Sequence, residues 1–280
     1  MPGKIAFVLG GGGHMGAHEV GMLRALLEHG IKPDLVVGTS IGALNGAGIA
    51  AEPSLSTVDK LEAVWLNLGR DVILGNPIFS GAANLVRRRT YLHSNRRLQD
   101  LLERMLPVRT FEELQVTFQC VAANIERAVE HWFSEGPLVP AILASAAVPG
   151  ILPVVEINGE HFMDGGIVNS IPIERAIHLG ATELYVLHVG RVEHSLKPPT
   201  NLLQTAMIAF EVARRHRFFR DMASLPEGVT AHVLPTGERE PARYDAFSQL
   251  RYRDFSAVRR RIAQAHRTTS EYLERLSEHR

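Results

Sequence analysis

The stretch that decides the fold of this 280-residue chain is Leu35-Val36-Val37-Gly38-Thr39-Ser40-Ile41-Gly42-Ala43-Leu44. It begins as a short apolar strand, turns through a Gly-x-Ser-x-Gly sequence and continues as a helix rich in Ala and Leu. This order of elements holds a serine at a tight corner, beside the unpaired N–H groups of the helix N-terminus. Ser40 is therefore a predicted nucleophile, and Gly38 and Gly42 are predicted to form the tight turn around it.

The residues before this stretch form another strand and helix. Residues 4–9 are mostly apolar, residues 10–13 are four glycines, and residues 16–29 carry apolar side chains at helical spacing. Because a second strand follows at once, the chain opens with a βαβ unit, which implies a parallel sheet. The glycine loop and Ser40 then both lie at carboxyl ends of adjacent strands, where open α/β sheets place their sites.

The glycine loop has more than one interpretation. The residues from Gly11 to Gly16 match Gly-x-Gly-x-x-Gly, a dinucleotide-binding pattern, but the next strand lacks the terminal Asp or Glu that binds ribose. A phosphate-binding P-loop is excluded because no Lys-Ser/Thr follows Gly16. We favour an oxyanion hole, in which the N–H groups of Gly11, Gly12 and Gly13 turn toward one point. Dinucleotide binding is kept as an alternative.

A serine nucleophile needs a proton acceptor within hydrogen-bond reach. A Ser-His-Asp hydrolase normally has several strands before its nucleophile, whereas one clear strand precedes that of Ser40 here. The chain offers Asp164 instead, which follows a predicted hairpin and precedes Gly165 and Gly166. Since two glycines let another backbone approach closely, Asp164 is the predicted base, with an ordinary Asp-Gly-Gly turn as the alternative.

Composition limits the class of protein and its partners. The chain is 45% hydrophobic and 21% charged, as in a globular protein, and 30 basic residues balance 30 acidic ones, so no overall field attracts nucleic acid. The single cysteine, Cys120, is predicted to be buried and allows no internal disulfide. No secretory signal is evident, and prolines interrupt the longest charge-free run, residues 136–155. We expect a cytoplasmic protein without a transmembrane segment.

One domain is predicted for residues 1–280, with a motif-bearing core at about 4–190 and a C-terminal helical portion at about 200–280. Further helices are predicted at residues 55–68, 95–105, 140–147, 202–222 and 255–276, and further strands at 115–122, 128–133, 154–157, 160–163, 184–189 and 229–234.

Three side-chain groups invite a functional interpretation, and for each we favour a structural one. Two basic clusters are predicted to be solvated, with contact to lipid phosphates as the alternative; they are Arg87-Arg88-Arg89 with Arg96-Arg97, and Arg214-Arg215-His216-Arg217. The late aromatic residues are assigned to the core, with an acyl pocket as the alternative; they are Phe210, Phe218 and Phe219. His14 and His18 lie one helical turn apart, next to Glu19, but no third ligand with suitable spacing accompanies the histidines, so no metal site is predicted there.

The ordered motifs resemble the patatin-like phospholipase family. They are Gly10-Gly11-Gly12-Gly13-x-x-Gly16, Gly38-Thr39-Ser40-Ile41-Gly42, Ala144-Ser145-Ala146-Ala147-Val148-Pro149-Gly150, and Asp164-Gly165-Gly166-Ile167-Val168-Asn169-x-Ile171-Pro172. The resemblance covers about residues 4–190. It implies a three-layer α/β/α sandwich with a mainly parallel central sheet. It also implies a Ser40–Asp164 dyad without histidine and an oxyanion hole on Gly11, Gly12 and Gly13.

The same resemblance implies a serine acyl hydrolase of the esterase, phospholipase A or lysophospholipase type. Such an enzyme cleaves lipid carboxyl esters and requires no metal or organic cofactor. The expected partner is a lipid or acyl ester, reached from the cytoplasm or by peripheral contact with the inner membrane surface. Met15 departs from the family, which usually has Arg or Lys there. This departure leaves the substrate class open and keeps a catalytically degenerate lipid-binding protein as an alternative.

Overall fold

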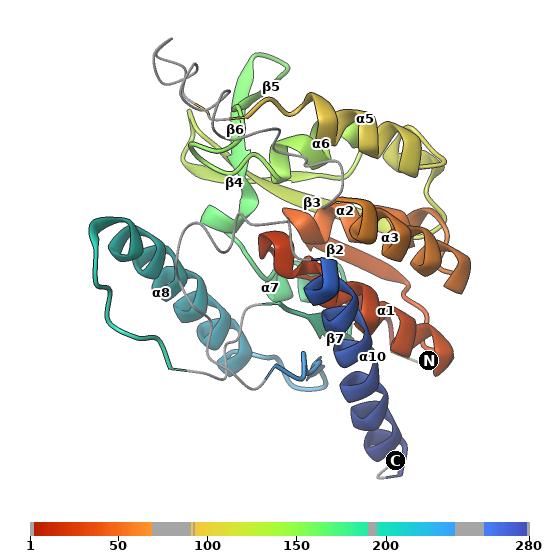
Figure 1. The fold of residues 1–280 in the computed structure, drawn as a ribbon. Helices are drawn as coiled ribbons and strands as arrows, with labels where there is room; N and C mark the ends of the chain where they lie inside the picture. Colours follow the sequence, from red (N-terminus) through yellow and green to blue (C-terminus); the bar gives the residue numbers. More distant parts are fainter. Residues whose placement is uncertain (1–2, 69–90, 92, 190–194, 239–254, 279–280) are drawn as a thin grey trace.

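A single mixed sheet lies at the centre of the computed structural model, which describes residues 3–68, 91, 93–189, 195–238 and 255–278 (Figure 1). Its strands are β1 (Ile5–Leu9), β2 (Leu35–Thr39), β3 (Thr117–Asn124), β4 (Val129–Phe133), β5 (Val155–Ile157), β6 (Glu160–Asp164), β7 (Glu183–Leu187) and β8 (Thr230–Val233). They pair in the order β5-β6-β3-β2-β1-β7-β8, and β4 also pairs with β3. All pairs from β3 to β8 are parallel, whereas those made by β4, β5 and β6 with their neighbours are antiparallel.

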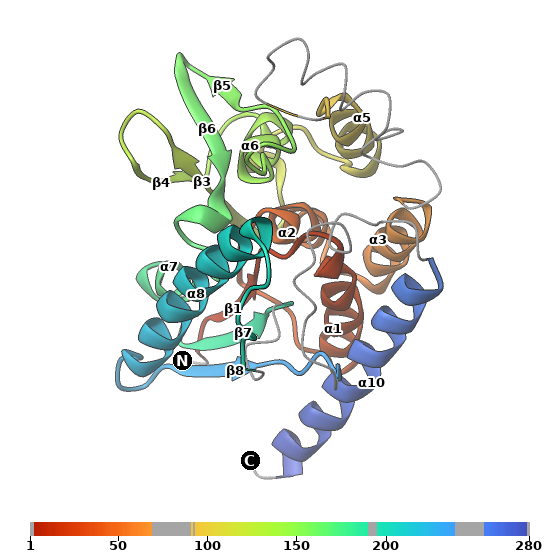
Figure 2. The same ribbon diagram turned by 60° about the vertical axis from the view of Figure 1, so that its left-hand side comes forward.

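Helices cover both faces of this sheet. They are α1 (Ala17–Glu28), α2 (Ile41–Ala51), α3 (Leu55–Leu68), α5 (Arg96–Met105), α6 (Leu138–Ser145), α7 (Ile173–His178), α8 (Leu202–Ala223) and α10 (Phe255–Glu278). Short 3-10 helices are η1 (Gly13–Gly16), η2 (Phe111–Glu113) and η3 (Gly165–Ile167). In Figure 2, α7 and α8 lie on one side of the central strands, and α1, α3 and α10 lie on the other.

The alternation of buried side chains along β1 explains the two helical layers. Phe7 and Leu9 belong to the apolar core shared with α1, α2, α3, α6 and α10, whereas Ala6 and Val8 belong to a second core with α7 and α8. Successive side chains of a strand point to opposite faces, and a strand covered on both faces is apolar throughout. The predicted three-layer α/β/α sandwich with a mainly parallel sheet is confirmed.

The C-terminal part of the chain contributes to both the sheet and one layer. β8 extends the sheet at β7, as expected for an edge strand. Helix α10 packs on α1 at Gly21, where an added Cβ would lie 2.2 Å from the carbonyl oxygen of Ile262. A side chain at Gly21 would therefore separate the two helices. Within the described residues, no helix has both the length and the hydropathy needed to cross a membrane.

Within the described residues, the predicted strands and α-helices match the structure closely, but the prediction lacks the three 3-10 helices and one short α-helix. The structure adds α7, a six-residue helix that begins after Pro172 and buries Ile173 and Ala176. A helix this short has too few turns to give a clear periodic pattern, so the sequence does not reveal it. Helix α6 begins two residues before its predicted start, because Pro140 lies in its first turn, where a missing N–H costs nothing.

Candidate active site

Strand β3 brings the two predicted catalytic residues together. Ala122 of β3 lies opposite Asp164 of β6, and the preceding Val121 lies opposite Thr39 of β2. Strand β4 pairs with β3 at residues 120–124, a stretch that also pairs with the end of β2 and with β6. Because β4 occupies one edge of β3 along this stretch, β2 and β6 must both lie on the other edge. The two strands run toward each other along this edge. Their ends meet, which places Ser40 beside Asp164.

The turn at Ser40 has the strained geometry of a nucleophile elbow. Ser40 has φ 55° and ψ −120°, a left-handed φ that costs a non-glycine residue about 1–3 kcal/mol. An added Cβ at Gly38 would lie 2.6 Å from the carbonyl oxygen of Gly42. One at Gly42 would lie 2.5 Å from the carbonyl oxygen of Leu9. Both glycines are required because the turn packs backbone against backbone.

The Ser40 hydroxyl donates a hydrogen bond to Asp164. Ser40 Oγ lies 2.6 Å from Asp164 Oδ2, while Asp164 Oδ1 accepts from the amide of Gly166 at 2.7 Å. Both side chains are buried. A Cβ at Gly165 would lie 2.1 Å from the carbonyl oxygen of Val121, so this glycine lets the turn after Asp164 sit directly on β3.

The surroundings of Asp164 favour its neutral form more than water does. Burial raises the pKa of Asp164 from 3.8 to about 6, and the hydrogen bonds from Ser40 and the Gly166 amide oppose this rise. At pH 7 the carboxylate is still mostly ionised. A buried carboxylate with a pKa close to neutrality, bonded to a serine hydroxyl, is suited to accept that proton.

The glycine loop lies directly against Ser40. A Cβ on Gly11 would lie 3.4 Å from Ser40 Cβ, in ordinary contact. The Gly11 amide, however, donates to the carbonyl oxygen of Ser170 at 2.8 Å. This bond corrects the prediction that Gly11 offers its N–H to an oxyanion, because that N–H already has an acceptor. Within the described residues, the structure gives no acceptor for the amides of Gly12 and Gly13.

Four residues without a predicted role hold the site together: Thr39, Ser145, Asn169 and Ser170. The Ser40 amide donates to Ser145 Oγ at 2.9 Å, which ties the elbow to the end of α6. The Thr39 hydroxyl donates to the carbonyl oxygen of Asn169 at 2.8 Å, and Ser170 holds Gly11. The quoted motifs contain these residues, but no sequence pattern states that a hydroxyl or carbonyl will face the elbow.

Several secondary predictions can now be compared with the structure. The arginines at 87–89 lie outside the described residues, and Arg96 and Arg97 are exposed, as predicted. Those on α8 are not solvated as predicted: the Arg214 and Arg215 side chains are 8% and 9% exposed, because Glu211 pairs with both. Phe218 is buried, as predicted. The core assignment is wrong for Phe210, which is 45% exposed, and for Phe219, which is 53% exposed. The burial of Cys120 is confirmed.

The candidate metal ligands do not converge. His18 Nδ1 lies 2.8 Å from the carbonyl oxygen of Met15, and Nε2 lies 3.3 Å from Glu238. Glu19 Oε2 instead accepts from Asn45 at 2.7 Å, and burial raises the pKa of Glu19 well above its usual value. In the part of the chain that the structure describes, no group of three metal-ligating side chains is found.

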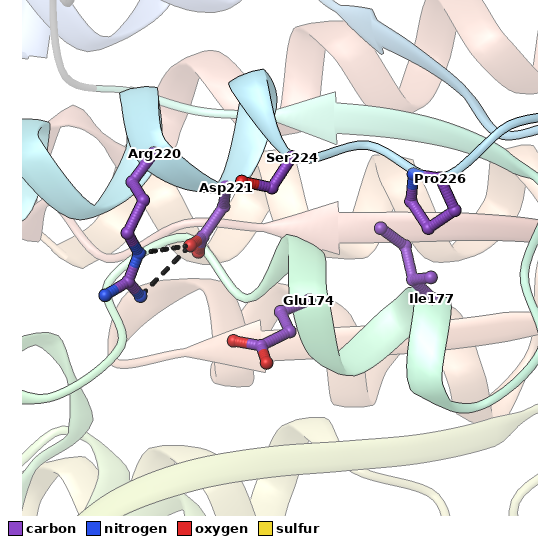
Figure 3. Close-up of a pocket in the computed structure, with 6 residues that line it drawn as sticks. All are labelled: Glu174, Ile177, Arg220, Asp221, Ser224 and Pro226. Atoms are coloured by element: carbon purple, nitrogen blue, oxygen red, sulfur yellow. Dashed lines mark hydrogen bonds and ion pairs between the residues drawn. The ribbon is translucent and has the colours of Figure 1, made fainter.

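A pocket of about 400 Å³ lies between α7 and the C-terminal end of α8 (Figure 3). It contains a second serine and aspartate, Ser224 and Asp221. The Asp221 carboxylate pairs with Arg220 at 3.2 Å and with Arg217 at 3.6 Å. The Asp221 carboxylate is paired with arginines rather than with a serine hydroxyl, so this pocket is a weaker candidate than the Ser40 site.

Comparison with known proteins identifies the family. The family model for patatin-like phospholipase matches residues 7–177, which include both Ser40 and Asp164. The chain belongs to the patatin-like phospholipase family. A Caenorhabditis elegans patatin-like phospholipase domain-containing protein is 34% identical over 204 residues, covering 68% of this chain and 14% of that protein. Human patatin-like phospholipase domain-containing protein 6 is 31% identical over 188 residues, covering 66% of this chain and 13% of its own length.

One further relative and one solved structure are similar to this chain. The Drosophila melanogaster neuropathy target esterase is 29% identical over 189 residues, covering 67% of this chain and 13% of that protein. The crystal structure of VipD from Legionella pneumophila aligns with 98% of this chain and 67% of its own, at 14% identity and a TM-score of 0.49. The chain thus spans about one-seventh of the length of the curated patatin-like relatives.

Proposed function

We propose that this chain hydrolyses carboxyl esters of lipids, with Ser40 as nucleophile and Asp164 as base. The observation that carries the proposal is the 2.6 Å hydrogen bond from Ser40 Oγ to Asp164 Oδ2, made at a strained elbow in a patatin-like phospholipase fold. Ser40 Oγ attacks the ester carbonyl carbon while its proton passes to Asp164. The carbonyl oxygen becomes an oxyanion, stabilised by the amides of Gly12 and Gly13 and by the N-terminus of α2.

The tetrahedral intermediate then expels the alcohol, which takes the proton from Asp164 and leaves an acyl group on Ser40. Water attacks this acyl-serine, and Asp164 accepts the proton of the water. The second intermediate releases the fatty acid and returns the proton to Ser40. No histidine, metal or organic cofactor takes part in these steps.

The surface beside the dyad supports a lipid as the acyl donor. Ile167 follows Gly166 directly and is 40% exposed, and Phe210 of α8 is 45% exposed. The Phe210 ring lies 3.6 Å from where a Cβ on Gly166 would be. Exposed apolar side chains next to a reactive centre favour contact with acyl chains or a lipid surface. We propose that the protein contacts a lipid surface peripherally and that acyl chains reach Ser40 past Ile167 and Phe210.

The test of the activity is labelling and turnover of the full chain. Wild type should react with a fluorophosphonate and hydrolyse p-nitrophenyl butyrate and lysophosphatidylcholine, whereas Ser40→Ala should lose labelling and turnover together. Ser224→Ala is the matched control, because it removes the other serine that neighbours an aspartate. Turnover that persists in Ser40→Ala, or labelling lost in Ser224→Ala, would contradict the assignment. Lipid binding by an unlabelled wild type would favour the degenerate alternative.

The lipid contact has its own test. Phe210→Ser should raise KM for lysophosphatidylcholine about tenfold and leave KM for p-nitrophenyl butyrate within about twofold, since one lost aromatic contact is worth about 1–2 kcal/mol. The control is Phe219→Ser, because Phe219 is 53% exposed on the same helix and packs on Phe218. Equal effects of the two substitutions would remove Phe210 from the lipid path.

A further inference from the structure

One arginine of helix α8, Arg214, contacts the glycine loop, residues 10–13. Arg214 Nη1 donates to the carbonyl oxygen of Gly11 at 3.0 Å. The other two nitrogens, Nε and Nη2, each donate to a different oxygen of Glu211 at 2.9 Å. Both side chains are buried, with exposures of 8% and 7%. This bidentate pairing fixes the plane of the guanidinium, so Nη1 points at Gly11 in a defined direction.

Fixing the Gly11 carbonyl also fixes the Gly12 amide. The Gly11 C=O and the Gly12 N–H belong to one planar trans peptide, in which the two groups point in opposite directions. The Arg214 bond therefore sets the orientation of the Gly12 N–H. The preceding peptide is held separately, since the Gly11 amide donates to Ser170. In a loop of four glycines, which have the widest choice of backbone angles, these two contacts and the 3.0 Å bond from the Gly10 amide to the carbonyl oxygen of Leu187 restrict the loop to one orientation.

The same bond strengthens the amide as a donor. A cation at a carbonyl oxygen draws electron density toward that oxygen and makes the N–H of the same peptide more positive. Glu211 pairs with Arg215 at 2.8 Å as well as with Arg214, so the three side chains carry one net positive charge. Little water is present to screen this charge, because all three side chains are buried.

We propose that Arg214 is a positioning residue for the reaction, which orients and polarises the Gly11–Gly12 peptide so that its N–H meets the oxyanion. This inference rests on the proposed hydrolase function. Glu211 holds Arg214 in place, and helix α8 is thereby part of the catalytic apparatus although it supplies no group that touches substrate. The cation that the sequence lacks at Met15 is supplied here from a residue about 200 positions later.

The experiment compares Arg214→Gln, Arg214→Lys and Arg217→Gln in the full chain. Arg217 is the matched control, because it also donates from α8 to a loop carbonyl, that of Val168 at 2.7 Å, but not to the glycine loop. With p-nitrophenyl butyrate, Arg214→Gln should lower kcat 30- to 300-fold and change KM less than threefold. Arg214→Lys keeps the charge and should retain at least ten times the kcat of Arg214→Gln.

Two further measurements separate positioning from folding. A trifluoromethyl ketone, which forms an oxyanion adduct with a serine, should bind Arg214→Gln at least 30-fold more weakly than wild type. Added guanidinium at millimolar concentration should restore part of the kcat of Arg214→Ala but none of that of Ser40→Ala. If Arg214→Gln and Arg217→Gln lose equal kcat, or if ketone affinity is unchanged, the positioning role is refuted. A wild type without turnover instead overturns the hydrolase function itself.

Discussion

Replacing Asp164 by Asn removes a charge that the folded protein holds almost without water. Burial raises the pKa of Asp164 from 3.8 to about 6. Each pKa unit corresponds to about 1.4 kcal/mol, so the ionised carboxylate costs the folded state about 3 kcal/mol at pH 8. An asparagine keeps the geometry, since its oxygen can accept from Gly166 and its amide can donate to Ser40. The variant should be more stable than wild type and inactive.

The sign and range of this effect follow from linkage. Well below the unfolded pKa of 3.8, at about pH 3 and lower, Asp164 is protonated in both folded and unfolded chains, and its ionisation costs the folded state almost nothing. As the pH rises, the unfolded chain ionises first and wild type loses stability, until the loss is complete above the folded pKa of about 6. The stability gain of Asp164→Asn should therefore be about 2 kcal/mol at pH 5 and about 3 kcal/mol at pH 8.

Urea unfolding of both proteins at several pH values measures this difference, because contributions from all other groups cancel between them. Activity gives a second test of the same pKa: kcat/KM of wild type should rise with pH through a single ionisation near 6. The variant should lose at least about 10³-fold in kcat. A stability gain that does not grow from pH 5 to pH 8, or a flat kcat/KM profile across pH 6, would refute the assignment of Asp164 as a buried base.

Three other predictions concern the surroundings of the site. Gly42→Ala should cost at least about 3 kcal/mol in urea unfolding, because its Cβ would lie 2.5 Å from the carbonyl oxygen of Leu9, and unchanged stability would contradict the packed elbow. Glu19→Gln should leave the unfolding free energy at pH 7 unchanged within about 1 kcal/mol, or raise it. Burial raises the pKa of Glu19, and a neutral glutamine can still accept the hydrogen bond from Asn45. A large loss of stability would argue for a charged Glu19. Cys120 is fully buried and burial raises its pKa, so iodoacetamide should modify it only at the rate of unfolding, and rapid labelling of the native chain at pH 8 would be inconsistent with this structure.

The sequence predicts the sandwich and the reactive pair for different reasons. The parallel sheet follows from local patterns, namely apolar strands, helical spacing and the order of elements, whereas the three layers are implied by the family resemblance. The Ser40–Asp164 pair is named from its motifs. Its geometry is not local, because the two residues are 124 positions apart and meet where β2 and β6 share one edge of β3. A register between distant strands leaves no periodic signal in a single sequence.

The role of α8 shows a second limit. A run of arginines on a helix is usually solvated, and this expectation fails where a buried carboxylate is placed one helical turn earlier. The spacing from Glu211 to Arg214 and Arg215 was visible in the sequence as an i, i+3 and i, i+4 pattern. This spacing indicates ion pairs with Glu211, but it does not show that the paired side chains are buried. Only the structure shows that Arg214 donates to the carbonyl oxygen of Gly11 in the glycine loop.

The meeting of β2 and β6 on β3 divides the proposed catalytic pair between two parts of the sheet. Ser40 belongs to the parallel strands at the centre, whereas Asp164 is carried by the antiparallel hairpin of β5 and β6 at one end of the strand order. Hairpin β5–β6 contacts β3 through three residue pairs, beginning at Asp164 and ending at Phe162. If the three β6–β3 pairs open, Asp164 moves away from Ser40, while the parallel strands β3, β2, β1, β7 and β8 stay paired. Hydrogen exchange in β6 and fluorophosphonate reactivity of Ser40 should therefore respond together to mild denaturant, before the central strands open.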